Sequence, residues 1–304
     1  MKLKTFCMAL GLVIGCSCTA PGPAYTTFAS PEDAVAALTK AVKEGKLDQV
    51  SAMFGPESKV LIDSSDPVTG QRNRATFTAA VAEGWRLESP NATTRTLIIG
   101  NEQWPFPIPL VKDGNTWRFD PAAGVEEVLA RRIGRNELAV LGLCRAYVAA
   151  QRIYARTAHD GRRPGLYAAV FRSDTGKQNG LYWDAVHGEK RSPLGDLVAA
   201  AAADGRAPTG NSSQPSPFHG YYFRILTAQG EAAPGGARSY LKDGELSEGF
   251  ALVAWPAQYD ATGVMTFIAN QDGIVREKDL GPDTDVAARA MTAYNPDGSW
   301  TIVR

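Results

Sequence analysis

Apolar residues recur at three- and four-residue intervals near the start of the chain, which is the spacing of one face of an α-helix. Residues 34–42 have this pattern, and Ser30 and Pro31 before it supply an N-cap and a favoured first helical residue. Similar patterns cover residues 46–54 and 74–85. We therefore predict three helices in the first part of the chain, of which the first two form a pair.

Strand-like runs rich in β-branched and aromatic residues follow at 94–100, 106–112 and 116–120. Asp113-Gly114 lies between the last two runs and is typical of a tight hairpin turn. The pattern predicts an N-terminal α+β domain over residues 28–122, made of a helix pair and a small curved antiparallel sheet.

The second half of the chain begins with a long helical pattern over residues 125–157, with a break expected near Gly134. This pattern is apolar around most of its circumference, which indicates a helix buried on several sides. Short runs with strand character follow at 220–230, 250–255, 263–270, 273–278 and 300–303. We predict a C-terminal α+β domain over residues 125–304, in which a long buried helix packs on an antiparallel meander sheet.

The first residues have the character of an export signal. Lys2 and Lys4 form a short positive end, and residues 5–15 are mostly apolar. This apolar segment is shorter than the roughly 20 residues that a membrane-spanning helix needs. We predict a signal peptide at 1–15 and a Pro-rich tether at 16–27.

The end of this segment, Val13-Ile14-Gly15-Cys16, resembles the bacterial lipobox. The resemblance implies cleavage before Cys16 and attachment of lipid to that residue. Because Ser17 and not Asp follows, we expect a periplasmic protein anchored to the outer membrane. The alternative is cleavage after Ala20, which would release a soluble periplasmic protein.

The charge of the chain argues against one class of partner. Removing Lys2 and Lys4 from the 32 basic residues leaves 30 against 32 acidic ones. A nucleic-acid-binding protein needs a concentrated basic surface, so no nucleic acid is expected as a partner. The cysteines that remain beside Cys16 allow a Cys18–Cys144 disulfide or a free, buried Cys144.

The sequence contains no HExxH zinc motif, no GxSxG nucleophile motif and no P-loop. Asp184 and His187 lie close together beside Tyr182 and Trp183, and an Asp–His pair can carry out acid–base chemistry. The alternative is a loop anchored by its aromatic residues, with a solvated imidazole. No catalytic residue is assigned beyond these two candidates.

Three aspartates near the end, Asp279, Asp283 and Asp285, are candidates for a calcium site, because Ca²⁺ takes clustered oxygen ligands. The same residues also fit a turn followed by a helix N-terminus. No other metal or cofactor is expected.

Three short motifs follow the long helix of the second half: Gly220-Tyr221-Tyr222-Phe223, Ala251 to Pro256, and Gly273-Ile274-Val275-Arg276. In this order they resemble the globular heads of type IV pilins and pseudopilins. The resemblance implies a helix-plus-sheet head. Pilins assemble through a long apolar N-terminal helix, whereas the apolar leader here is short and lies about 120 residues upstream of the corresponding helix.

The whole chain also resembles a bacterial secreted family known only as domain of unknown function 2950. The motifs GYYFRIL, APGGARSY, GFALVAWPAQY and DLGPDT carry this resemblance. It implies an exported protein and no particular reaction.

These observations lead to three hypotheses. The first is a non-catalytic binding or scaffold lipoprotein, attached to the membrane by its lipid and bound to an envelope protein or glycan. The second is a hydrolase-like envelope enzyme that uses the region of Asp184 and His187. The third is a pilin-like assembly or secretion-linked subunit. Ligand, partner and oligomeric state do not follow from the sequence.

Overall fold

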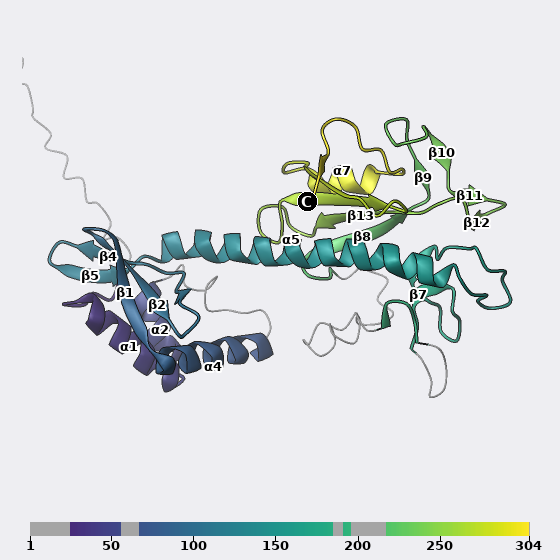
Figure 1. Cartoon of the computed structure of the whole chain (residues 1–304). Helices are drawn as coiled ribbons and strands as arrows, with labels where there is room; N and C mark the ends of the chain where they lie inside the picture. The colour runs from purple at the N-terminus through teal and green to yellow at the C-terminus, as the bar shows by residue number, and fades with distance from the viewer. Residues whose placement is uncertain (1–24, 56–66, 185–190, 196–216, 304) are drawn as a thin grey trace, which may run out of the picture. The chain divides into compact units, whose positions relative to one another are not determined.

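The computed structural model describes residues 25–55, 67–184, 191–195 and 217–303 (Figure 1). The chain divides into two compact units, Met1–Gly124 and Val125–Arg304, and each is described by itself. Both units combine helices with antiparallel sheet, so the predicted α+β class is confirmed. Cys16 and Cys18 lie outside the described residues, as does the predicted signal peptide.

The first unit contains three described helices and a five-stranded sheet. The helices are α1 (Pro31–Lys43), α2 (Leu47–Phe54) and α4 (Pro67–Glu83). The strands are β1 (Trp85–Asn91), β2 (Thr94–Ile99), β3 (Trp104–Pro105), β4 (Leu110–Asp113) and β5 (Thr116–Phe119). They are ordered β1-β2-β4-β5, with β3 paired to β2.

Local chemistry explains where these elements begin and end. The backbone N–H of Asp33 donates to Ser30 Oγ at 3.1 Å, so Ser30 caps α1 as predicted. Trp85 does not end a helix, as the sequence pattern suggested, but begins β1. Gly84 explains the difference, because its φ of +145° lies in a region that favours glycine and ends the helix.

The middle run of the predicted sheet is also interrupted. Only its last part lies in a strand, β4, because the short β3 ends before residue 106 and Pro107 and Pro109 lie between the two strands. Proline has no backbone N–H to donate to a strand ladder, so continuous pairing is lost there. The core of this unit lies between the helices and the sheet, where Phe119 packs edge-on against Phe54 and Phe28.

The second unit is built on one long helix, α5 (Pro121–Tyr154). The helix is continuous through Gly134, so the predicted break near that residue is wrong. After it come two short parallel strands, β6 (Val170–Arg172) and β7 (Gly180–Tyr182).

A five-stranded antiparallel sheet follows, with the order β16-β15-β14-β13-β8. Its strands are β8 (Tyr221–Leu226), β13 (Ala251–Pro256), β14 (Met265–Asn270), β15 (Val275–Asp279) and β16 (Thr301–Ile302). The short strands β9 (Ala228–Gln229), β10 (Arg238–Ser239), β11 (Leu241–Lys242) and β12 (Glu245–Leu246) pair separately as β9 with β10 and β11 with β12. Since β13 to β16 are neighbours in chain order, they form the predicted meander.

Helices cover the sheet of the second unit on its two faces (Figure 1). On one face, Tyr147 of α5 donates to the carbonyl of Ala251 at 3.1 Å. On the other face lies α7 (Thr284–Ala290), whose Asp285 accepts from Trp255 Nε1 at 2.8 Å. All six residues of β13, which lies between β14 and β8, are buried between these layers. The predicted packing of a long helix on an antiparallel sheet is therefore confirmed.

Among the described helices, none combines the length and the apolar character required to cross a membrane.

Candidate functional site

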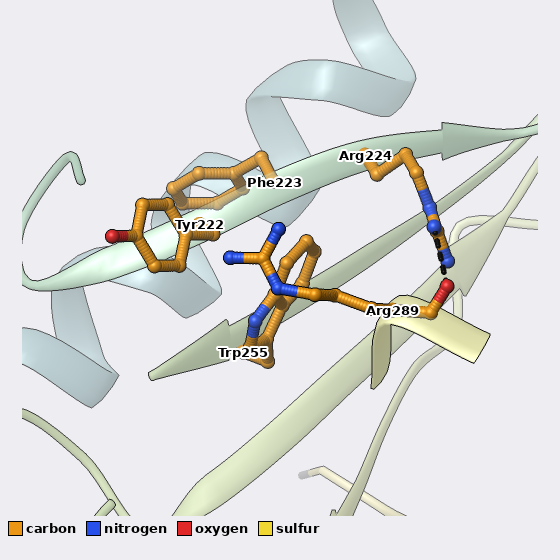
Figure 2. Close-up of a pocket in the computed structure, with 5 residues that line it drawn as sticks. All are labelled: Tyr222, Phe223, Arg224, Trp255 and Arg289. Atoms are coloured by element: carbon orange, nitrogen blue, oxygen red, sulfur yellow. Dashed lines mark hydrogen bonds between the residues drawn. The ribbon is translucent and has the colours of Figure 1, made fainter. Parts of the chain in front are cut away.

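A pocket lies on the α7 face of the second sheet, and three elements of the fold contribute to it (Figure 2). Its volume is about 220 Å³. We call it the arginine–aromatic pocket, and its lining residues are Tyr222, Phe223 and Arg224 from β8, Trp255 from β13 and Arg289 from α7.

The strand register brings the aromatic residues together. Tyr222 is paired directly with Trp255 across β8 and β13, and their ring centroids are 5.7 Å apart. Because side chains alternate along a strand, Arg224 lies on the same face of β8 as Tyr222, toward α7. Tyr221, the first residue of β8, points to the other face, toward α5, and its hydroxyl donates to Glu137.

Arg289 is held in place by a carboxylate and two rings. Its Nε lies 2.9 Å from both oxygens of Asp285, one helical turn earlier. Its guanidinium lies 5.5 Å from the ring centroid of Tyr222 and 5.8 Å from that of Trp255, at the distance of a cation–π contact. The hydrogen bonds from Arg289 and then Trp255 hold the pKa of Asp285 below its usual value. The side chains of Arg289 and Asp285 are 51% and 48% exposed, so this ion pair lies at the surface of the unit.

Arg224 binds the C-terminal end of α7. Its Nη1 donates to the carbonyl of Arg289 and its Nη2 to that of Ala288, both at 2.8 Å, and Nη2 also contacts the carbonyl of Met291. These carbonyls belong to the C-terminal end of α7, where a cation is favoured. Burial and the nearby charge of Arg289 lower the pKa of Arg224. Arg224 thus fixes the helix that carries Arg289, and its donors are largely used in doing so.

The chemistry of this pocket is that of binding. Its lining offers the rings of Tyr222 and Trp255, two guanidinium groups and no nucleophile or carboxylate of its own, while the ring of Phe223 lies on the opposite face of β8, next to Phe171. Sequence reasoning did not find it, because the contributing residues are far apart along the chain. The available local signals were the alternation in Tyr221 to Leu226 and the i,i+4 spacing of Asp285 and Arg289.

Of the candidate pair Asp184 and His187, which the sequence predicts, only Asp184 is among the described residues. Asp184 accepts from the hydroxyl of Tyr182 at 2.5 Å and from Arg172 Nη2 at 2.8 Å. Its side chain is 72% exposed, so these contacts are made at the surface. His187 lies outside the described residues, and the proposed Asp–His contact is not tested.

The three calcium candidates are directed to separate partners. Asp279 accepts from the backbone N–H of Gly281 and the hydroxyl of Tyr259, at 2.8 and 3.2 Å. Asp283 is the N-cap residue of α7, and Asp285 is occupied by Arg289 and Trp255. Within the described ranges, no three His, Cys, Asp or Glu side chains gather as a metal ligand set. These contacts agree with the turn-and-helix interpretation of the three aspartates, and the calcium interpretation stays a prediction.

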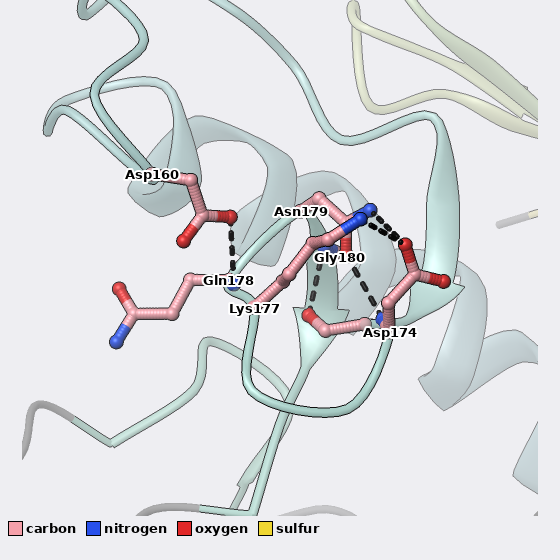
Figure 3. Close-up of polar contacts among 7 residues, drawn as sticks. Asp160, Asp174, Lys177, Gln178, Asn179 and Gly180 are labelled. Atoms are coloured by element: carbon pink, nitrogen blue, oxygen red, sulfur yellow. Dashed lines mark hydrogen bonds and ion pairs between the residues drawn. The ribbon is translucent and has the colours of Figure 1, made fainter.

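A polar loop next to β7 is closed on itself (Figure 3). Asp174 Oδ2 accepts from Lys177 Nζ and Asn179 Nδ2, both at 3.0 Å, and Asn179 Oδ1 accepts from the backbone N–H of Asp174. The backbone N–H of Gln178 donates to Asp160 at 2.8 Å. The hydrogen bonds from Lys177 and Asn179 lower the pKa of Asp174. These polar groups stabilise a turn, and we assign them no ligand.

Two glutamates lie on the α5 side of the sheet. Glu137 Oε1 accepts from the backbone N–H groups of Val264 and Met265, at 2.9 and 3.0 Å, and so fixes the start of β14. Burial raises the pKa of Glu277 on β15, and the negative charge of Glu137 raises it further.

This shift predicts how stability depends on pH. A carboxyl group whose pKa is raised on folding binds its proton more tightly in the folded state, so stability falls as pH rises from about 4.5 through the raised pKa. We expect Glu277→Gln to remove this fall, so that its advantage in melting temperature over the wild type grows between pH 4 and pH 7. Thermal unfolding followed by circular dichroism measures it. Glu126→Gln, at an exposed position on α5, is the control, and an advantage of Glu277→Gln that does not change with pH would contradict the prediction.

Cys144 on α5 is a free thiol and fully buried, which agrees with one of the two sequence alternatives. Burial raises the pKa of this thiol to about 12. The reactive thiolate is therefore scarce in the folded state, and reagents have no access to it.

We expect Cys144 to react with a maleimide only when the second unit unfolds. A variant with serine at Cys7, Cys16 and Cys18 leaves it as the single thiol of the chain. Labelling of the folded protein should be slower than in guanidinium by about a thousandfold or more, since access requires unfolding. Mass spectrometry of timed samples measures the rate, and rapid labelling of the native protein would show that this part of the core is open.

Comparison with known proteins gives a family and no activity. The family model described as "Protein of unknown function (DUF2950)" matches residues 25–303, and the chain belongs to this family. No curated protein and no solved structure matches the chain. The likeness to pilin heads therefore has no solved counterpart among these comparisons.

Proposed function

We propose that this member of the DUF2950 family is an exported, non-catalytic binding module that is anchored to the membrane by lipid at Cys16. Its binding site is the arginine–aromatic pocket, and its partner is a component of the cell envelope. The observation that carries the proposal is the position of Arg289, which pairs with Asp285 and lies beside the rings of Tyr222 and Trp255. A binding site gains affinity when its groups are ordered before the ligand arrives.

The location outside the cytoplasm rests on the leader. Lys2, Lys4 and the apolar residues up to Gly15 fit a signal peptide, and Cys16 has the position of a lipidated cysteine. Mass spectrometry of the N-terminal peptide from the native host tests this, and we expect a chain that begins at a lipid-modified Cys16. An unmodified, uncleaved start on cytosolic material would contradict it.

A non-catalytic role is supported by the composition of the pocket. Arginines and aromatic rings orient and hold a ligand, but at neutral pH an arginine does not serve as general base. The enzyme alternative depends instead on Asp184 and His187. It predicts that the wild type turns over a cell-wall substrate and that His187→Ala abolishes this turnover without changing the melting temperature. Such a result would contradict the non-catalytic role and favour the enzyme.

The binding role is tested by recovery of a partner with matched arginine variants. The full chain is cross-linked in intact cells and purified from solubilised envelopes as wild type, Arg289→Gln or Arg238→Gln. Arg238 is an exposed arginine next to the ring of Tyr240, 5.8 Å away, and does not line the pocket. We expect wild type and Arg238→Gln to recover the same partner and Arg289→Gln to lose most of it. Equal recovery by all three chains would contradict the assignment of the site.

A pilin-like assembly role is the second candidate, and the packing of α5 on the β13–β16 meander favours it. It predicts ordered self-assembly of the lipid-anchored chain, visible by electron microscopy. A strictly monomeric protein in sedimentation experiments would count against it.

A further inference from the structure

We infer that the arginine–aromatic pocket binds a carboxylate attached to a compact apolar group, as at the C-terminus of a peptide that ends in an apolar residue. This inference rests on the proposed binding function and names the ligand class of the same site.

The charge of the pocket favours an anion. Arg224 and Arg289 are close enough for the charge of Arg289 to lower the pKa of Arg224. Asp285 neutralises only one of the two, so the group keeps one net positive charge. The side chain of Arg289 is 51% exposed, so a ligand can reach this charge from solvent.

The available donors favour a carboxylate. Asp285 accepts from the Nε of Arg289, and Figure 2 shows the two terminal nitrogens of Arg289 directed toward Tyr222. The parallel N–H groups of a guanidinium match the two oxygens of a carboxylate. Phosphate recognition usually draws on further donors, and those of Arg224 are directed at the carbonyls of α7.

The rest of the lining favours an apolar body over a sugar. Trp255 Nε1 donates to Asp285, and the aromatic part of the wall consists of the rings of Tyr222 and Trp255. The hydroxyl groups of a sugar acid would lose water here and find few partners, which costs free energy. An apolar side chain has no such cost and gains from contact with the rings.

The size of the pocket sets an upper limit on this group. Its volume of about 220 Å³ lies below the roughly 300–1,000 Å³ that is usual for sites of drug-sized ligands. A single apolar side chain with its carboxylate is therefore the expected occupant, and any further part of the ligand would extend into solvent.

The experiment uses a pair of probes that differ only in charge. N-acetyl-L-phenylalanine carries the carboxylate, and N-acetyl-L-phenylalaninamide carries a neutral amide in its place. Isothermal titration calorimetry on the detergent-solubilised full chain should show the acid binding about tenfold more tightly than the amide or better, since hydrogen bonds to charged groups are the stronger ones. Glucuronic acid, a carboxylate on a sugar ring, should bind more weakly than N-acetyl-L-phenylalanine.

Variants test whether a preference for the acid over the amide comes from the arginine–aromatic pocket. Arg289→Gln should bind acid and amide alike, Arg289→Lys should keep a reduced preference because it loses the paired donors, and Arg238→Gln should behave as wild type. Far-ultraviolet circular dichroism confirms that each variant is folded.

Three results would overturn the inference: equal binding of acid and amide by the wild type, no saturable binding of the acid at 10 mM, or an acid preference that persists in Arg289→Gln. Tighter binding of glucuronic acid than of N-acetyl-L-phenylalanine would contradict an apolar group on the ligand and indicate an acidic glycan instead. The proposed function is judged separately, because loss of the cross-linked partner with Arg289→Gln would stand even where these probes fail.

Discussion

Replacement of Gly263 by alanine is expected to lower the free energy of unfolding of the second unit by about 3 kcal/mol, the upper part of the range for overpacked cores. A Cβ at this position would approach Cε2 of Tyr221 to 2.5 Å and its Oη more closely still. The ring has no room to retreat, because Tyr221 is fully buried and its hydroxyl donates to the carbonyl of Met265 at 3.0 Å. The added methyl group therefore forces the ring and β14 apart.

Chemical denaturation followed by circular dichroism measures this loss. Gly142→Ala is the matched control, because Gly142 lies at an exposed position inside α5 with no atom within 4 Å of an added Cβ. There the change should stabilise by about 0.5–1 kcal/mol through helix propensity. In a Tyr221→Leu background, Gly263→Ala should cost clearly less. Equal effects of Gly263→Ala and Gly142→Ala would contradict the overlap.

The helices could be predicted from the sequence wherever one face is buried and a cap is present. Ser30 caps α1, and the apolar pattern of α5 from Val140 to Tyr154 contacts the core that the pattern predicts. The expected break near Gly134 was wrong for a definable reason. A glycine costs a helix about 1 kcal/mol, and the rest of a 34-residue helix outweighs that cost.

Strand β1 could not be predicted because it carries no burial pattern. Six of its seven residues are exposed and the seventh is half-buried, so apolar and polar positions do not alternate along it. Its backbone pairing with β2, from Trp85–Ile99 to Glu88–Thr96, holds it in place instead. Hydrophobic periodicity in a sequence indicates which residues are buried. A strand that is held mainly by backbone hydrogen bonds therefore has no periodic pattern by which it could be predicted.

The arginine–aromatic pocket could not be predicted for a different reason. The pocket combines residues from three different elements, Tyr222, Trp255 and Arg289. Along the chain, each of these residues is more than 30 positions from the next. The pairing of Asp285 with Arg289 is readable from their spacing on one helix. Which sheet face that helix covers is decided by tertiary packing, and only the register of β8 with β13 places Tyr222 beside Trp255.

Gln151→Leu is expected to destabilise the second unit by about 3 kcal/mol, although leucine is apolar and similar in size. Gln151 is fully buried, and its side-chain amide forms two hydrogen bonds with the backbone of Ala168. Oε1 accepts from Ala168 N–H at 2.9 Å, and Nε2 donates to the Ala168 carbonyl at 2.8 Å and to Tyr147 Oη at 3.1 Å. Leucine leaves both backbone groups of the buried Ala168 without these partners, and each such group costs about 1–3 kcal/mol.

Two further variants separate the lost hydrogen bonds from a change in packing. Gln258→Leu, at an exposed position in the same unit, should change stability by less than about 0.5 kcal/mol. Gln151→Glu keeps an acceptor for Ala168 N–H but buries a charge when ionised, so its folded-state pKa is raised and its stability should increase as pH falls toward 4. A Gln151→Leu protein as stable as Gln258→Leu would mean that segment 165–168 is held by packing alone, because the amide would then contribute nothing that leucine lacks.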